Sequence, residues 1–192
     1  MITSTHTTNK TLTDKVRLLV LTLSVGFIAT LISCDDTTTT YSNRELVRIN
    51  YAVSSYTELF NVMGNYGQFA SIREMGNGKV RMTLGSTGKY TDYTPSKTQQ
   101  YFYFGLGGVI VGTNYNGENL AYDLSCPYCD AAAYRLSLSD NGYAKCSHCG
   151  ISYDMNNYGV ILSTDSTRQY GSLRGLYRYK ITYDGTNMSV YN

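Results

Sequence analysis

The chain has 192 residues, of which 42% are hydrophobic and 16% charged. This composition suits one compact domain and excludes a collagen-like or extended disordered polymer. The 16 basic and 14 acidic residues nearly balance, so the charge does not predict a nucleic-acid partner. Five cysteines in a chain of this length need an assignment before any function can be argued.

The chain begins with a predicted lipoprotein signal peptide, residues 1–33. Three basic residues precede an uncharged apolar stretch at 18–32, which is typical of a signal peptide and too short for a permanent membrane span. The stretch ends in Leu31-Ile32-Ser33-Cys34, which resembles the bacterial lipobox. The resemblance implies that Cys34 is lipidated and becomes the first residue of the mature protein. The alternative is an ordinary secretory signal that ends near a chance cysteine.

Removal of residues 1–33 leaves a formally neutral chain, in which His148 is the only histidine and four cysteines remain besides Cys34. Residues 34–44 are predicted to be the lipidated cysteine and a polar tether, and residues 45–192 the folded domain. We therefore expect a lipid-anchored protein of the cell envelope, facing the periplasm or the cell surface. Acidic residues directly after Cys34 resemble both an inner-membrane retention signal and a surface-export signal, so the membrane face stays open.

From Leu46 onward, hydrophobic and polar residues alternate with the period of a β-strand. The alternating segments are 47–53, 80–84, 134–138 and 177–183. Turn sequences with glycine stand between them at 76–78, 116–117, 141–142 and 184–185. Only 55–63 could form a short helix, and 86–100 is predicted to be a loop. The pattern predicts an all-β fold, a small antiparallel β sandwich.

Tyrosine is unusually frequent, with 20 residues and no tryptophan. Tyr is a good strand residue that can be half buried, and we favour this explanation. The alternative is a stacking surface for sugars or for a partner protein. The run at 101–104 would place aromatic rings on both faces of a strand, which predicts burial on both sides or contact with a partner.

Two Cys-x-x-Cys pairs carry the strongest chemical signal of the chain. Cys126 and Cys129 form the first pair, and Cys146 and Cys149 form the second. Two such loops can present four thiolates to one tetrahedral Zn(II). The segment between them predicts a hairpin, which would bring both loops to one end of the sheet.

These loops belong to a longer order of motifs that resembles a Rieske-type domain, especially the small Rieske-like lipoproteins of Bacteroidota. The order comprises 107–111, 120–127, 144–150, Gly159 and a closing strand at 176–180. The resemblance covers residues 45–192 and implies a β domain with two metal-binding loops. A Rieske cluster takes one Cys and one His from each loop. Here the first histidine position is Tyr128 and the second is Cys149, so the resemblance implies an all-cysteine ligand set.

The four cysteines can be in one of three alternative states. We favour a four-thiolate Zn(II) site with a mainly structural role, in a protein that acts as a binding or accessory module for an unknown envelope partner. The alternative function is electron transfer by an all-cysteine [2Fe-2S] cluster to a redox partner. The third state is a pair of disulfides, which an extracytoplasmic compartment permits.

No catalytic residue is predicted, and an enzyme is not expected. His148 lies between two ligand positions, where it would face solvent or donate a hydrogen bond to a sulfur, and it lacks an acid partner. Asp123 and Asp154 flank the cysteine loops and are expected to form turn hydrogen bonds. The glycine-rich segment 105–108 lacks the following Lys and helix of a phosphate loop, so close packing of a β corner explains it better.

Overall fold

The computed structural model describes residues 41–94 and 102–192. The predicted signal peptide, Cys34 and most of the tether lie outside the described residues. The strands are β1 (Val47–Ala52), β2 (Gln68–Gly76), β3 (Lys79–Leu84), β4 (Tyr90–Tyr93), β5 (Tyr103–Phe104), β6 (Val109–Thr113), β7 (Asn119–Asp123), β8 (Leu136–Leu138), β9 (Tyr143–Cys146), β10 (Ser152–Asp154), β11 (Val160–Ser163), β12 (Arg178–Tyr183) and β13 (Asn187–Tyr191), with a 3₁₀ helix η1 (Val53–Ser55) and an α-helix α2 (Thr57–Val62).

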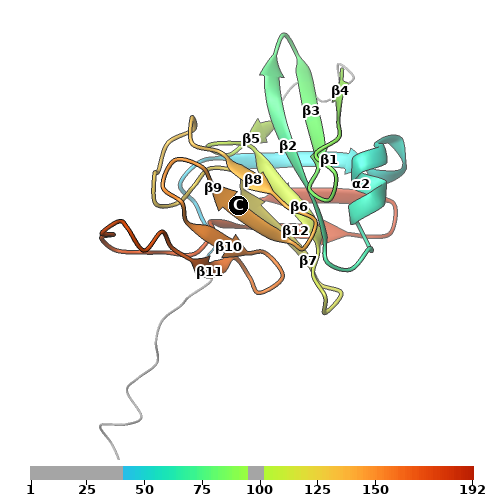
Figure 1. Ribbon diagram of the computed structural model, residues 1–192. Helices are drawn as coiled ribbons and strands as arrows, with labels where there is room; N and C mark the ends of the chain where they lie inside the picture. The colour runs from blue at the N-terminus through green and yellow to red at the C-terminus, as the bar shows by residue number, and fades with distance from the viewer. Residues whose placement is uncertain (1–40, 95–101) are drawn as a thin grey trace, which may run out of the picture. The chain divides into compact units, whose positions relative to one another are not determined.

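The strands form two antiparallel sheets, which confirms the all-β prediction. The larger sheet has nine strands in the order β4-β3-β2-β6-β7-β12-β13-β1-β5, and the smaller has four in the order β11-β10-β9-β8 (Figure 1). In the chain, the whole small sheet is inserted between β7 and β12, which are neighbours in the large sheet. This insertion carries both cysteine pairs.

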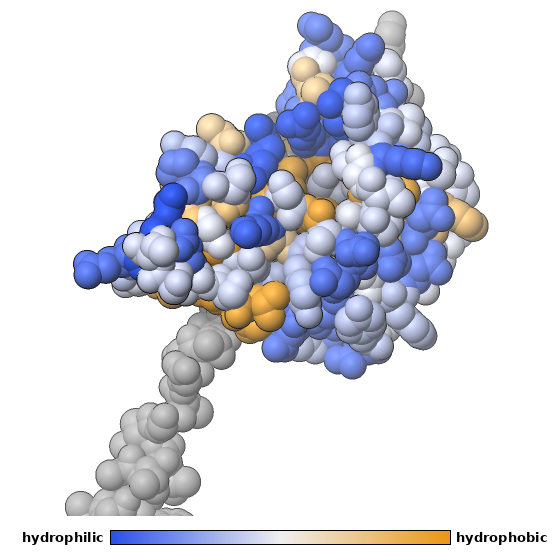
Figure 2. Space-filling model, in the orientation of Figure 1, coloured by the Kyte–Doolittle hydropathy of each residue, from blue (hydrophilic) through white to orange (hydrophobic). Residues whose placement is uncertain are grey.

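Two hydrophobic cores lie on the two faces of the large sheet. The first core is formed largely by alternate residues of β1, β2, β3 and β6, and the second lies between the large sheet and the small one. Strand β6 contributes Val109 and Val111 to the first core and Ile110 to the second. Because both its faces are buried, this strand begins with three consecutive apolar residues, Val109–Val111, instead of alternating. On the face shown in Figure 2, the exposed side chains are mostly hydrophilic.

The predicted local structure is largely confirmed. The alternation at 47–53 becomes β1, whose burial alternates, and the short helix becomes α2 within the predicted range. Each predicted turn connects two strands and contains glycine with positive φ. The predicted loop at 86–100 is wrong in part, because β4 lies within it and pairs with β3. Its remainder from 95 onward lies outside the described residues.

The aromatic run at 101–104 is only partly a strand. Phe104 belongs to β5, and both Phe102 and Phe104 pack against the first core while half buried. Tyr103 is exposed. Of the two predicted alternatives, burial on both sides is wrong for the described part, because β5 is a short edge strand, and contact with a partner stays a prediction.

A corner built on Asp123 joins the large sheet to the inserted segment. Its fully buried carboxylate accepts hydrogen bonds from the backbone N–H groups of Leu106 (2.7 Å), Gly107 (3.0 Å) and Ser125 (2.7 Å) and from the hydroxyl of Tyr179. A Cβ at Gly107 would lie 2.6 Å from the backbone nitrogen of Ser125. The expected hydrogen-bonding role of Asp123 and the close packing of the glycine segment are both present.

Candidate metal centre

The structure brings the four predicted cysteines together. The Sγ atoms of Cys126, Cys129, Cys146 and Cys149 all lie within 4.8 Å of one another. The first pair lies in the loop between β7 and β8, and the second begins at the last residue of β9. The β8–β9 hairpin separates the two loops in sequence, as predicted, and its antiparallel pairing brings them to the same end of the small sheet.

Both cysteine loops close by the same backbone turn. The carbonyl of Cys126 accepts the N–H of Asp130, and the carbonyl of Cys146 accepts the N–H of Gly150, each at 2.9 Å. Asp130 and Gly150 follow the second cysteine of their pairs and have φ of 56° and 82°. Glycine suits this left-handed position, and aspartate is one of the few other residues that tolerate it. A Cβ at Gly150 would also lie 2.9 Å from the Cβ of Asp165.

The spacing of the sulfurs is that of ligands around one ion. Cys126 Sγ lies 3.6 Å from Cys149 Sγ, and Cys129 Sγ lies 3.7 Å from Cys146 Sγ. A tetrahedral zinc with Zn–S bonds of about 2.3 Å separates its sulfurs by about 3.8 Å. A disulfide needs about 2.05 Å, and all four cysteines are free. The four-cysteine group could therefore hold a metal ion.

The thiols lie in a poorly solvated environment. Cys126 and Cys146 are fully buried, Cys149 is buried and Cys129 is half buried. Burial raises the pKa of Cys149 to about 11. Burial also raises the pKa of Cys129, together with hydrogen bonding to the other thiols and the charge of Cys126. Four thiols this close together cannot all ionise unless a cation lies between them.

Cys126 is the one cysteine of the group whose pKa is lowered. Burial acts to raise its pKa, but hydrogen bonds from the backbone N–H of Cys129, the Tyr153 hydroxyl, the Cys149 thiol and the backbone N–H of Tyr128 outweigh burial. The Tyr153 side chain is fully buried, and its oxygen lies 3.6 Å from Cys126 Sγ. The loop and the core thus favour the thiolate that a metal requires.

A segment after β11 supports the second loop from outside. The hydroxyl of Tyr170 donates to the carbonyl of Cys149 at 2.6 Å, and Arg168 donates to the carbonyl of His148 at 2.9 Å. The ring of Tyr170 also meets that of Tyr128 edge to face, with centroids 5.2 Å apart. The two cysteine loops are thereby linked through one aromatic contact. Sequence reasoning missed this support, since nothing local marks these contacts.

Two residues outside the first loop hold it in place: Arg44, near the start of the described residues, and Tyr177, near the end of the insertion. Arg44 forms an ion pair with Asp130, and the Tyr177 hydroxyl donates to the same carboxylate at 3.0 Å. Arg44 also donates to the Tyr177 hydroxyl at 3.2 Å. The pair is solvent-exposed, so its contribution to stability is small, and its role is to position the loop.

His148 is solvent-exposed, as expected, and it also contacts a sulfur. Its Nδ1 lies 3.4 Å from Cys129 Sγ, and its ring stacks on that of Tyr134 with centroids 4.0 Å apart. It has no acid partner in the described part of the chain. Asp154 accepts the N–H groups of Asn156 (2.9 Å) and Asn157 (3.3 Å), which is the expected turn role.

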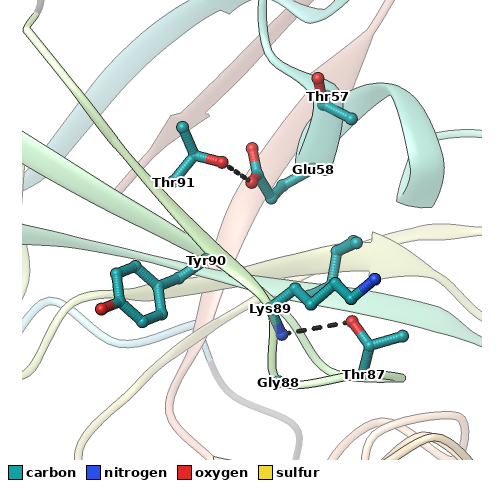
Figure 3. A pocket seen from close by; sticks show the side chains of 8 residues that line it. Thr57, Glu58, Thr87, Gly88, Lys89, Tyr90 and Thr91 are labelled. Atoms are coloured by element: carbon teal, nitrogen blue, oxygen red, sulfur yellow. Dashed lines mark hydrogen bonds between the residues drawn. The ribbon is translucent and has the colours of Figure 1, made fainter.

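A separate cleft of about 530 Å³ lies between α2 and the β3–β4 turn (Figure 3). Glu58 is buried at this cleft, and its carboxylate accepts hydrogen bonds from the hydroxyls of Thr91 (2.6 Å) and Tyr93 (2.7 Å). Burial and the hydrogen bond to Glu58 raise the pKa of Tyr93. Because both carboxylate oxygens are used to hold α2 against β4, we assign Glu58 a structural role. No sequence pattern predicted it.

No family model, curated protein or solved structure matches this chain. None of the helices in the described ranges 41–94 and 102–192 is long and apolar enough to cross a membrane.

Proposed function

We propose that the four cysteines hold one Zn(II) ion as a structural centre, and that the protein is an accessory or binding module of the cell envelope. The observation that carries the proposal is the compact sulfur set, with all four Sγ atoms within 4.8 Å of one another. Zinc has no redox chemistry and accepts four thiolates in tetrahedral geometry. Because the ligands come from two loops on either side of a hairpin, the ion would clamp the end of the small sheet.

Electron transfer by a [2Fe-2S] cluster is the alternative function. The half-buried Cys129, with the exposed His148 ring 3.4 Å from its sulfur, would offer a route from a cluster to a partner. In such a cluster, however, the cysteines bind two different irons joined by bridging sulfides. Sulfurs on different irons must then lie farther apart than the ligands of a single ion. All four Sγ atoms lie within 4.8 Å of one another, including those that are not in the closest pairs, and this supports a single ion.

Two disulfides are the third possibility. The closest sulfur pairs, at 3.6 and 3.7 Å, are in contact but not bonded. Since bound metal protects thiolates, a zinc-loaded centre would persist in a compartment that permits disulfides.

A lipid anchor on Cys34 and a Rieske-like fold complete the proposal. The anchor is supported by the signal-peptide pattern and the lipobox alone. The fold resemblance is supported by the order of elements along the chain, in which strands β6 and β7 precede both cysteine loops and strands β12 and β13 follow them. The membrane, through the anchor, and an envelope protein would then be the partners.

Elemental analysis of the mature chain from residue 35 onward tests the zinc centre. We expect one zinc per chain, no iron and no visible absorption after purification without air. Substitution by Co(II) should give the absorption of a tetrahedral thiolate complex. A brown preparation that bleaches on reduction would establish the cluster instead. A metal-free protein whose four thiols react only after reduction would establish disulfides.

A further inference from the structure

The three most exposed large hydrophobic side chains of the described chain belong to α2 and to two neighbouring loops. Phe60, Tyr66 and Tyr115 are 64%, 67% and 64% exposed. Phe60 lies on α2 and Tyr66 on the loop to β2, while Tyr115 lies on the β6–β7 turn. The two loops lie side by side (Figure 1), joined by a hydrogen bond of 2.8 Å from the Gly67 N–H to the Thr113 carbonyl. We call Tyr66 and Tyr115, whose loops are joined, the aromatic patch.

The two tyrosines of the patch are held in place by glycines. Gly67 and Gly117 have positive φ, and each faces the tyrosine of the other loop. A Cβ at Gly67 would collide with the Tyr115 ring, and a Cβ at Gly117 would lie 3.2 Å from Cε1 of Tyr66. The rings therefore rest against backbone while most of their surface faces water. Fixed rings bind a ligand at a lower entropic cost than mobile ones.

The surroundings of the patch are uncharged and rich in amides. Residues 59–67 and 111–117 contain no charged residue, and Asn61, Asn65 and Asn116 are sequence neighbours of the aromatic residues. The amide nitrogens of Asn61 and Asn65 donate to backbone carbonyls of the helix, so these two side chains can serve a ligand as acceptors. The flanking charged residues are Glu58, which is buried, and Glu118, whose carboxylate accepts the Asn114 amide (2.9 Å) and the Tyr158 hydroxyl (2.6 Å). Without Lys or Arg the patch does not suit nucleic acid or an anionic polymer.

We infer that the aromatic patch binds a neutral saccharide. The C–H face of a pyranose is apolar and slightly positive, so it complements the electron-rich face of a Tyr ring. The hydroxyl groups at the edge of the sugar can donate to the amide oxygens of Asn61 and Asn65, whose nitrogens are bound to the helix, and can both donate to and accept from the amide of Asn116. This inference does not depend on the proposed zinc centre, because the patch lies on two loops that connect to strands of the large sheet, β2, β6 and β7.

The test uses the folded, metal-loaded mature chain and a panel of soluble oligosaccharides. Saturation-transfer NMR and calorimetry with cello-, malto-, xylo- and manno-hexaose should detect at least one ligand. Tyr66→Ala and Tyr115→Ala should each weaken its binding about tenfold, while Tyr66→Phe retains the ring and should bind as the wild type does. Tyr191→Ala, at a 40% exposed tyrosine on β13, is the matched control and should change nothing.

Metal content and melting temperature should be the same in all these variants. Loss of zinc from the wild type would then leave saccharide binding intact, which separates the two proposals. The inference is overturned if no neutral oligosaccharide of the panel binds. It is also overturned if the Ala variants bind normally, if a charged galacturonate oligomer binds more tightly, or if sedimentation shows that the patch mediates self-association.

Discussion

Cys146→Ser should destabilise the protein mainly through the loss of metal. Cys146 is fully buried, and its Sγ lies 3.7 Å from that of Cys129, so serine would remove one of four ligands without opening the site to water. A thousandfold loss of zinc affinity removes about 4 kcal/mol of stabilisation at a fixed free zinc concentration that saturates both proteins. For a domain of this size each kcal/mol lowers the melting temperature by about 2–4 °C, so we expect a fall of about 10 °C.

Calorimetric melting with and without a strong chelator separates this effect from simple core damage. In metal-free protein a buried hydroxyl in place of the thiol should cost only about 1–2 kcal/mol. The difference between Cys146→Ser and the wild type should therefore shrink when zinc is removed. Ser147→Ala, at an exposed position of the same loop, should melt as the wild type does. An equal difference with and without metal would refute a structural zinc centre.

Further substitutions and a change of pH test other parts of the reasoning. Tyr153→Phe removes a hydrogen bond to the Cys126 thiolate, so it should raise the pKa of that thiol. Zinc binding should then weaken about tenfold in a competition assay. An unchanged pKa and an unchanged zinc affinity would exclude a role of Tyr153 in stabilising the thiolate. Gly150→Ala should lower the unfolding free energy by about 1–3 kcal/mol because Gly150 has positive φ. Gly171→Ala is the control and should not lower it, because nothing lies near the Cβ there. Equal effects would contradict the role of Gly150 in closing the second cysteine loop. Zinc retention against a chelator should fall at least about tenfold per pH unit as pH is lowered, because binding releases protons from thiols of raised pKa; a flat profile would contradict thiolate ligation. Palmitate labelling should be lost in Cys34→Ser, and persistent labelling would exclude the anchor.

The sequence was sufficient where the signal is local. Alternation predicted β1 because one face of that strand packs on the first core and the other faces water. Glycine with asparagine or aspartate predicted the turns, since few other residues accept positive φ. The two cysteine pairs could also be found, because the Cys-x-x-Cys spacing is a pattern within a single loop.

Prediction failed where a segment depends on distant partners. Strand β4 is polar and almost fully exposed, so it shows no alternation, and its pairing with β3 is supported by the ion pair between Arg81 and Asp92 at 2.7 Å. Glu58 gave no signal because its hydroxyl partners lie more than thirty positions along the chain. Contacts of this kind are fixed by the fold as a whole.

The supports of the two cysteine loops suggest what a bound ion would connect. The first loop is held by Arg44, the last residue of the predicted tether, and by Tyr177, just before β12. The second is held by Arg168 and Tyr170, in the segment that leads back to the large sheet. An ion that joins the two loops therefore also joins the start of the described chain to the end of the insertion. Its stabilisation should extend beyond the small sheet to the segment through which the lipid anchor would pull on the domain.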